Sequence, residues 1–374
     1  MTIAFVDLKR QYQRLKPQIL ANIEAVLDHG QYIMGPEVGS LERALSDYTG
    51  AVYTIAVASG TDALAMALMA EDVGPGDAVF LPSFTFTATA EVIVLLGATP
   101  VFIDIDCSTL NLDPEDLQRR MEYVAATTEL RPKAVIAVDL FGFPANYPAI
   151  KSVVDGYNAV VVGDAAQSLG GTSDNKRVGT LAEVTATSFF PAKPLGAYGD
   201  GGALFTDDGN RAELYRSIRA HGKGAGKYDI ERVGLNSRLD TLQAAVLMAK
   251  IDIFDDEMSA RRSVSEKYNE RLEEYTGSFV DRSESAWAQY PILVDHRDEV
   301  MADLKAKGIP TAVYYPRPMH RQPAYEQFAT LGDPPRVSEE ISERVLCLPI
   351  HPYLKEEEIE RVASAVCNSA EGVR

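Results

Sequence analysis

Residues 159–168, AVVVGDAAQS, decide the fold class of this chain. Four apolar residues and a glycine run directly into an acidic residue, Asp164. An apolar run without alternation is typical of a strand that is buried on both faces, as in a parallel sheet covered by helices. Because ligands of such sheets bind beyond the carboxyl ends of the strands, the side chain of Asp164 is predicted to emerge into a binding cleft.

Six further short apolar runs alternate with helical segments on both sides of this stretch. They are YTIAVAS at 53–59, AVFLPS at 78–83, TPVFIDID at 99–106, AVIAVDLFG at 134–142, VTATSFF at 184–190 and GGALFT at 201–206. Runs of this kind, alternating with helices, predict an α/β fold with a mainly parallel central sheet.

Apolar residues at helical spacing predict the main helices before and after these alternating segments. They cover residues 7–28, 38–48, 239–263, 300–307 and 356–366. The helix at 239–263 is predicted to end a large domain. We therefore expect a large domain over residues 1–250 and a smaller C-terminal α/β domain over residues 251–374.

Composition and charge exclude several classes of function. The 54 acidic and 36 basic side chains leave a net charge of −18, which argues against nucleic acid or an anionic membrane as the main partner. Three separated cysteines and five scattered histidines predict neither a disulfide framework nor a metal site. Without a signal segment or a run of about 20 apolar residues, a soluble cytoplasmic protein is expected.

The residues around Asp164 and at 59–61 each allow two interpretations. Asp164 could pair with a protonated pyridine nitrogen, with Gln167 beside a ring oxygen, or it could cap a helix that begins at Ala165. Gly60 and Thr61 begin a helix in SGTDAL, where free N–H groups suit a phosphate but small polar residues are also ordinary caps.

Lys193 is the most informative single residue of the chain. It lies in SFFPAKPLGAYGDGGALF, residues 188–205, between prolines and apolar residues, where a solvated surface charge is a poor explanation. Burial lowers the pKa of a lysine toward the range in which the free amine is a nucleophile. Together with the phosphate cradle and the strand-end carboxylate, Lys193 predicts a site for pyridoxal 5'-phosphate (PLP).

Five segments, in their order and spacing, resemble the DegT/DnrJ/StrS family of nucleotide-sugar aminotransferases. They are SGTDAL, SFTFTAT, DAAQS, SFFPAKPLGAYGDGGA and GLNSRLDTLQAA, and the resemblance extends from residue 5 to residue 366. It implies a PLP-dependent transferase of fold type I, which is the aspartate aminotransferase type. It also implies a homodimer with shared active sites.

The resemblance assigns roles to residues of this chain. Lys193 matches the lysine that is joined covalently to PLP and later moves a proton, and Asp164 matches the carboxylate that keeps the pyridine nitrogen protonated. Family members that dehydrate sugars have histidine in place of Lys193, so transamination is expected. The remaining cofactor positions are Gly60, Thr61, Phe86, Gln167 and Ser188, with Asn236 reaching the phosphate from the neighbouring subunit.

The C-terminal half resembles a narrower subgroup. The segments GIPTAVYYPRPMHRQPAY, AWAQYPILVDHRD and RVLCLPIHPYL resemble enzymes that aminate C3 of a UDP-linked 2-acetamido-3-oxo-glucuronic acid, with glutamate as donor, for lipopolysaccharide sugars. The substrate contacts that this implies are Tyr32, Met34, Arg238, Tyr314, Tyr315, Arg317 and His320. For the tyrosines, arginine and histidine at 314–320, packing at an interface is the alternative.

Other functions stay open at this point. A 4-keto or 3-keto 6-deoxy nucleotide sugar is an alternative substrate, and a non-catalytic binding or regulatory protein of the same fold is an alternative class. The chain also departs from the family pattern at two positions, with Asp139 where many relatives have histidine and Phe143 where glutamine is frequent.

Overall fold

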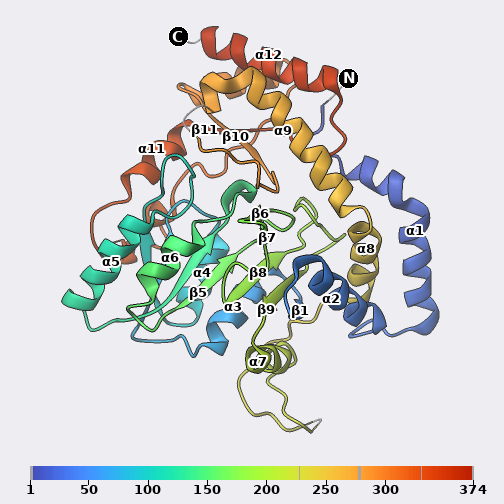
Figure 1. Ribbon diagram of the computed structural model, residues 1–374, viewed down its shortest axis with the longest axis vertical. Coiled ribbons are helices and arrows are strands. Elements are labelled where there is room, and N and C mark those ends of the chain that lie inside the picture. The colour runs from blue at the N-terminus through green and yellow to red at the C-terminus, as the bar shows by residue number, and fades with distance from the viewer. Residues whose placement is uncertain (1–2, 227, 277–278, 330, 373–374) are drawn as a thin grey trace.

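A seven-stranded sheet forms the centre of the molecule (Figure 1). The structure is a computed structural model that describes residues 3–226, 228–276, 279–329 and 331–372. The strands are arranged in the order β1-β9-β8-β5-β4-β2-β3; β9 runs antiparallel to both of its neighbours, β1 and β8, and the other neighbouring pairs are parallel. Their bounds are β1 Tyr53–Val57, β2 Asp77–Pro82, β3 Thr99–Ile103, β4 Arg131–Val138, β5 Val160–Asp164, β8 Val184–Ser188 and β9 Gly202–Thr206. All seven strands that the apolar runs predict are confirmed, as is the mainly parallel sheet.

Helices cover both faces of this sheet because its strands are apolar on both sides. Along β2, Val79 and Leu81 face one apolar core, and Ala78 and Phe80 face another. The first core is covered by α3 Gly60–Ala70, α4 Thr87–Leu95 and α7 Gly209–Arg219; the opposite face is covered by α2 Pro36–Thr49, α5 Pro114–Thr127, α6 Tyr147–Val154 and α8 Thr241–Ile251.

A second, smaller set of elements packs around its own core above the sheet (Figure 1). It contains the antiparallel pair of β10 Tyr290–Leu293 and β11 Val345–Leu348 with α10 Arg297–Ala306 and α12 Glu356–Gly372. The long helix α9 Phe254–Thr276 contributes Met258 to a core of the sheet and Tyr268 to the second core. The domain boundary after residue 250 stays a prediction.

The remaining elements are peripheral. The helix α1 Leu8–His29 packs against α8, and its N-cap residue Asp7 accepts a hydrogen bond from the N–H group of Arg10. Two short strands, β6 Thr172–Ser173 and β7 Lys176–Arg177, form a hairpin after β5. No helix in the described ranges is long and apolar enough to cross a membrane.

Two local predictions about helices are wrong. The segment 239–263 is not one helix, because α8 ends at Ile251 and α9 starts at Phe254 after two turn residues. The break allows α8 to pack on α1 and α2 while α9 runs toward the second core. No helix begins at Ala165, where the chain forms a turn.

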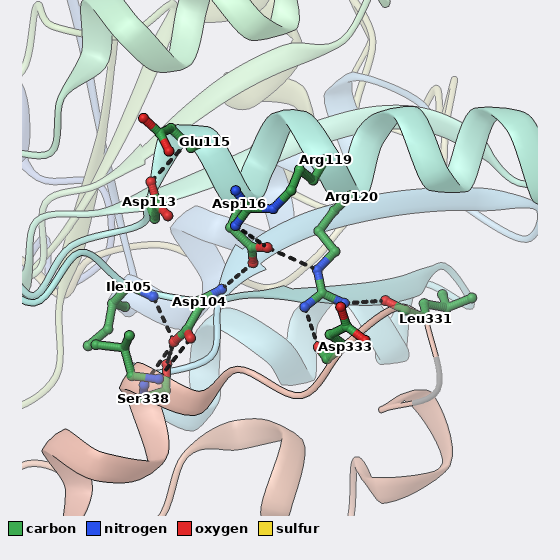
Figure 2. Close-up of polar contacts among 11 residues, drawn as sticks. Asp104, Ile105, Asp113, Glu115, Asp116, Arg119, Arg120, Leu331, Asp333 and Ser338 are labelled. Atoms are coloured by element: carbon green, nitrogen blue, oxygen red, sulfur yellow. Dashed lines mark hydrogen bonds and ion pairs between the residues drawn. The ribbon is translucent and has the colours of Figure 1, made fainter.

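A polar cluster, which we call the α11 clamp, ties the helix α11 Arg336–Arg344 to the sheet (Figure 2). The carboxylate of Asp104, just after β3, accepts hydrogen bonds from the N–H and hydroxyl groups of Ser338 at 2.8 and 2.7 Å. Asp116 on α5 accepts from the N–H group of Asp104 at 2.8 Å and pairs with Arg120. Arg120 in turn donates to the carbonyl oxygen of Asp333. The clamp thus links elements more than 200 residues apart in the sequence.

Candidate active site

A cavity of about 420 Å³ lies at the carboxyl ends of β1, β2, β4, β5 and β8. This is the edge of the sheet at which the topology predicts a ligand. Lys193, Asp164, Gly60, Thr61, Phe86, Gln167, Ser188, Tyr314 and Tyr315 all line it. The structure therefore brings together seven predicted cofactor residues and two predicted substrate residues in one space.

Asp164 is a buried carboxylate at the end of β5, with 7% of its surface exposed. Its Oδ2 accepts a hydrogen bond from the hydroxyl group of Thr89 at 3.1 Å, and its Oδ1 accepts from the N–H group of Ala166 at 3.2 Å. Burial raises the pKa of Asp164, and these donors and the charge of Lys193 oppose that rise. Because no helix follows, the carboxylate does not serve as a helix cap.

Lys193 lies in a tight turn after β8. Its N–H group donates to the carbonyl oxygen of Phe190 at 2.8 Å. Helix α8 holds the segment that follows this turn, because the amine of Lys250 donates to the carbonyl oxygen of Gly196 at 2.6 Å. Burial lowers the pKa of the Lys193 amine, and the nearby carboxylate of Asp164 opposes this effect. A lowered pKa favours the neutral, nucleophilic amine.

The N-terminus of α3 and the end of β8 form the opposite wall. The hydroxyl group of Ser59 accepts from the N–H group of Asp62, as an N-cap does. The N–H groups of Gly60 and Thr61 have no partner within the helix and can bind an anion. A Cβ atom on Gly60 would lie 2.7 Å from the Cβ atom of Ser188, so α3 and β8 can pack this closely only with glycine at position 60.

Aromatic and amide side chains form the remaining wall. The side-chain amide of Gln167 donates to the hydroxyl group of Tyr315 at 3.3 Å and accepts from the N–H group of Phe141 at 2.7 Å. The ring of Phe86 lies 6.2 Å from that of Tyr315 and is about half exposed. Tyr314 is 5.7 Å from Tyr315, ring to ring. These contacts fix Gln167 and leave one face of Phe86 available for stacking.

Other predicted residues lie outside this cavity. Asn236 and Arg238 line a separate cavity of about 380 Å³, and Asp200 lines both cavities. Tyr32 and Met34 are exposed on the segment between α1 and α2.

The structure places neither Arg317 nor His320 in the cavity. Arg317 is exposed. The ring of His320 is 3% exposed, and its Nδ1 and Nε2 atoms bond with the hydroxyl group of Ser83 at 2.6 Å and the carboxylate of Glu339 at 3.0 Å. His320 therefore ties α11 to the loop after β2, which leaves its ring no free nitrogen for a substrate.

Two residues of the site were missed in the sequence. Thr89 bonds with Asp164, and Gln289, just before β10, lines the cavity with a buried side-chain oxygen that has no hydrogen-bond partner. A polar residue directly before an apolar strand was the available signal for Gln289. Thr89 lies in the quoted segment SFTFTAT, but only the fold shows that it reaches β5.

Comparison with known proteins decides the family. Residues 13–367 match the model of the DegT/DnrJ/EryC1/StrS aminotransferase family. The chain belongs to this family. It is 47% identical over 370 residues to the UDP-2-acetamido-2-deoxy-3-oxo-D-glucuronate aminotransferase of Pseudomonas aeruginosa, with 98% of this chain and 100% of the relative covered. It is also 40% identical to a pleiotropic regulatory protein of Geobacillus stearothermophilus, with 98% of each chain covered.

A solved structure supports the same assignment. The crystal structure of a DegT/DnrJ/EryC1/StrS aminotransferase from Brucella abortus has a TM-score of 0.96 and 45% identity, and covers 98% of this chain and 99% of that one. The family member described here is therefore an aminotransferase with the fold type I architecture that the sequence predicts.

Proposed function

We propose that this aminotransferase uses PLP to transfer an amino group from L-glutamate to C3 of UDP-2-acetamido-2-deoxy-3-oxo-D-glucuronate. The observation that carries the chemistry is the pairing of Lys193 and Asp164 within one buried cavity. The similarity at 47% identity, over nearly the whole of both chains, supports the substrate. The product would be a precursor of a surface polysaccharide such as lipopolysaccharide.

The residues present fit PLP. The cavity wall that admits only glycine at position 60 has free N–H groups and hydroxyl groups for a phosphate, contributed by Gly60, Thr61 and Ser188. Asp164 offers a buried carboxylate to a protonated pyridine nitrogen, and Gln167 lies three residues later in the turn that follows β5. A buried carboxylate is stable when a cationic partner shares its burial.

Bound PLP supplies an electron sink for the charge that develops when an amino-bearing carbon loses a proton. The chain's own residues do the rest. Lys193 would hold the cofactor through its amine and would accept and return the proton at Nζ, for which its lowered pKa suits it. Asp164 would keep the pyridine nitrogen protonated, Phe86 would stack on the ring, and Tyr315 would hold Gln167 beside it.

The substrate side of the site is proposed from position and chemistry. Tyr314, Tyr315 and the unpaired amide oxygen of Gln289 line the cavity and suit sugar hydroxyl groups. Arg238 and Asn236, which open into the neighbouring cavity, would reach the site of a partner subunit in a homodimer. A guanidinium group is the side chain best suited to a diphosphate or a uronate. We place the enzyme in the cytoplasm, where such nucleotide sugars are made.

The decisive experiment is a substrate panel. Keto nucleotide sugars are generated in situ by the matching dehydrogenases or dehydratases and assayed for glutamate-dependent amination. We expect product from the 3-oxo-uronate and none from the K193A variant. Activity confined to 4-keto 6-deoxy sugars would replace the proposed substrate and leave the chemistry intact.

The alternative of a non-catalytic regulatory protein has support in the name of one relative. The presence of Lys193, Asp164 and Gln167 in one cavity argues against it, because a binding module needs no such set. Two measurements separate the classes. A yellow preparation that bleaches on addition of glutamate, and a borohydride-fixed cofactor on Lys193, indicate the enzyme; a colourless protein that does not respond to PLP indicates the regulator.

A further inference from the structure

Asp139 is fully buried directly after β4 and does not line the cofactor cavity. Three donors converge on its carboxylate. The N–H group of Ala145 and the hydroxyl group of Tyr147 both donate to Oδ1 at 2.8 Å, and the hydroxyl group of Ser168 donates to Oδ2 at 2.6 Å. Both oxygens of the Asp139 side chain therefore accept hydrogen bonds.

The neighbouring strand is shaped to admit this network. A Cβ atom on Gly163 would lie 2.7 Å from the hydroxyl oxygen of Tyr147, so this residue of β5 leaves room for the hydroxyl group that reaches Asp139. The N–H group of Asp139 also donates to the carbonyl oxygen of Asp164 at 3.1 Å. Asp139 therefore contacts Asp164, the last residue of β5, and Ser168 in the turn that follows.

The segment 164–168 carries the two side chains that would face the cofactor ring. Asp164 ends β5, Gln167 lies in the turn that follows, and Ser168 comes directly after Gln167. The short helical turn after Asp139 also holds Gln167, because the N–H group of Phe141 donates to its side-chain oxygen at 2.7 Å. The segment 139–141 thus holds the segment 164–168 at three points.

We propose that Asp139 is a positioning residue for the cofactor, acting through Ser168 on the segment 164–168, which carries Asp164 and Gln167. The proposal rests on the proposed PLP site and adds a residue that does not touch the cavity. Tyr147 donates to the same carboxylate from α6 and does not belong to this segment.

A matched pair of variants tests the proposal. S168A and Y147F each remove one hydroxyl donor from the carboxylate of Asp139, and only Ser168 belongs to the turn. PLP affinity of the apoprotein is measured by absorbance titration, and urea unfolding of the apoprotein gives the stability change. We expect S168A to weaken PLP binding about tenfold, the scale of one lost hydrogen bond to a charged group, and Y147F to weaken it by less than about twofold. Equal losses of affinity in the two variants would overturn the proposal.

The D139N variant gives an independent readout. Burial raises the pKa of Asp139 from 3.8 to about 7, with Asp164 adding to the rise and the donors from Ser168, Ala145 and Tyr147 opposing it. The folded protein then holds a proton that the unfolded chain releases, so this group costs stability as pH rises from 3.8 to about 7. We expect D139N to bind PLP more weakly than the wild type and to lose less stability over that pH range.

Wild-type PLP affinity in D139N would overturn the positioning role. Failure of the proposed function looks different. In that case the wild-type protein itself would fail to bind PLP on Lys193, or would bind it and aminate none of the keto sugars.

Discussion

The α11 clamp (Figure 2) and the cofactor cavity both bury charged side chains, but they differ in whether the polar groups have hydrogen-bond partners. In the clamp, both oxygens of Asp104 and of Asp116 accept hydrogen bonds, and Arg120 donates to three oxygens. In the cavity, the buried side-chain oxygen of Gln289 has no hydrogen-bond partner, and burial shifts the pKa values of Lys193 and Asp164 in opposite directions.

The difference shows how polar groups are used in the two regions. A buried polar group with all of its partners present holds parts of a fold together, and one that lacks a partner is costly until a ligand supplies it. The clamp should therefore matter for stability and little for chemistry. The cavity should matter for chemistry and little for the stability of the apoprotein.

The sharpest test of the comparison is Lys193→Ala. We expect the rate of amination to fall by about 10⁴-fold, because the covalent anchor and the proton carrier are lost together. Steady-state kinetics with glutamate and the keto sugar measure this. The apoprotein should unfold at the same temperature as the wild type or higher. Lys193→Arg, which keeps the charge, should be as inactive, and substantial activity in either variant would contradict the assignment.

Asp164→Asn removes the charge opposite Lys193 and keeps the shape of the side chain. We expect kcat to fall by about 10²- to 10³-fold, the usual cost of losing one preorganised electrostatic contact. The absorbance spectrum of the bound cofactor should also shift. Thr89→Val, which removes only the donor to Asp164, is the matched control with a smaller loss. A Thr89→Val effect as large as that of Asp164→Asn would show that geometry, not charge, is lost.

In the clamp, Arg120→Ala should lower stability and leave the chemistry of the cavity unchanged. We expect the free energy of unfolding to fall by about 3 kcal/mol, because Asp116 and two carbonyl oxygens lose a buried cationic partner. Urea denaturation measures this change, and PLP affinity should stay unchanged. Arg120→Lys keeps the charge but has no planar set of donors, so its free energy of unfolding should lie between those of the wild type and Arg120→Ala. A large loss of PLP affinity in Arg120→Ala would show that the clamp also supports the cofactor cavity.

The smallest expected effect comes from Gly60→Ala. Its Cβ atom would meet that of Ser188 at 2.7 Å, so α3 and β8 must move apart at the phosphate wall. We expect PLP affinity to fall by about tenfold, because displaced donors lose roughly one hydrogen bond. Gly39→Ala is the control, since its Cβ atom meets nothing closer than 3.6 Å within α2. It should raise stability by about 0.5–1 kcal/mol and leave PLP binding alone.

The segments that the sequence placed correctly are those in which the information is local. An apolar run that ends in a polar or charged residue defines a buried strand and a strand-end side chain together. This is why Asp164, Lys193, Gly60 and Ser188 could be assigned to one cavity before the fold was known.

The break between α8 and α9 was missed for the opposite reason. Apolar residues at helical spacing continue on both sides of Asp252, and the helices differ in that α9 goes on from the core it shares with α8 to the second core. Helical periodicity reports which residues are apolar, not which core receives them.

By itself, the sequence determined the succession of strands and helices along the chain, the family and the residues at the strand ends. Each of these depends on short segments of adjacent residues. Only the tertiary structure decided that His320 is bound to Ser83, 237 positions away, and that Asp139 collects donors from α6 and from the turn after β5. Such contacts depend on which segments the packed sheet brings together, and no local pattern of residues encodes that distance.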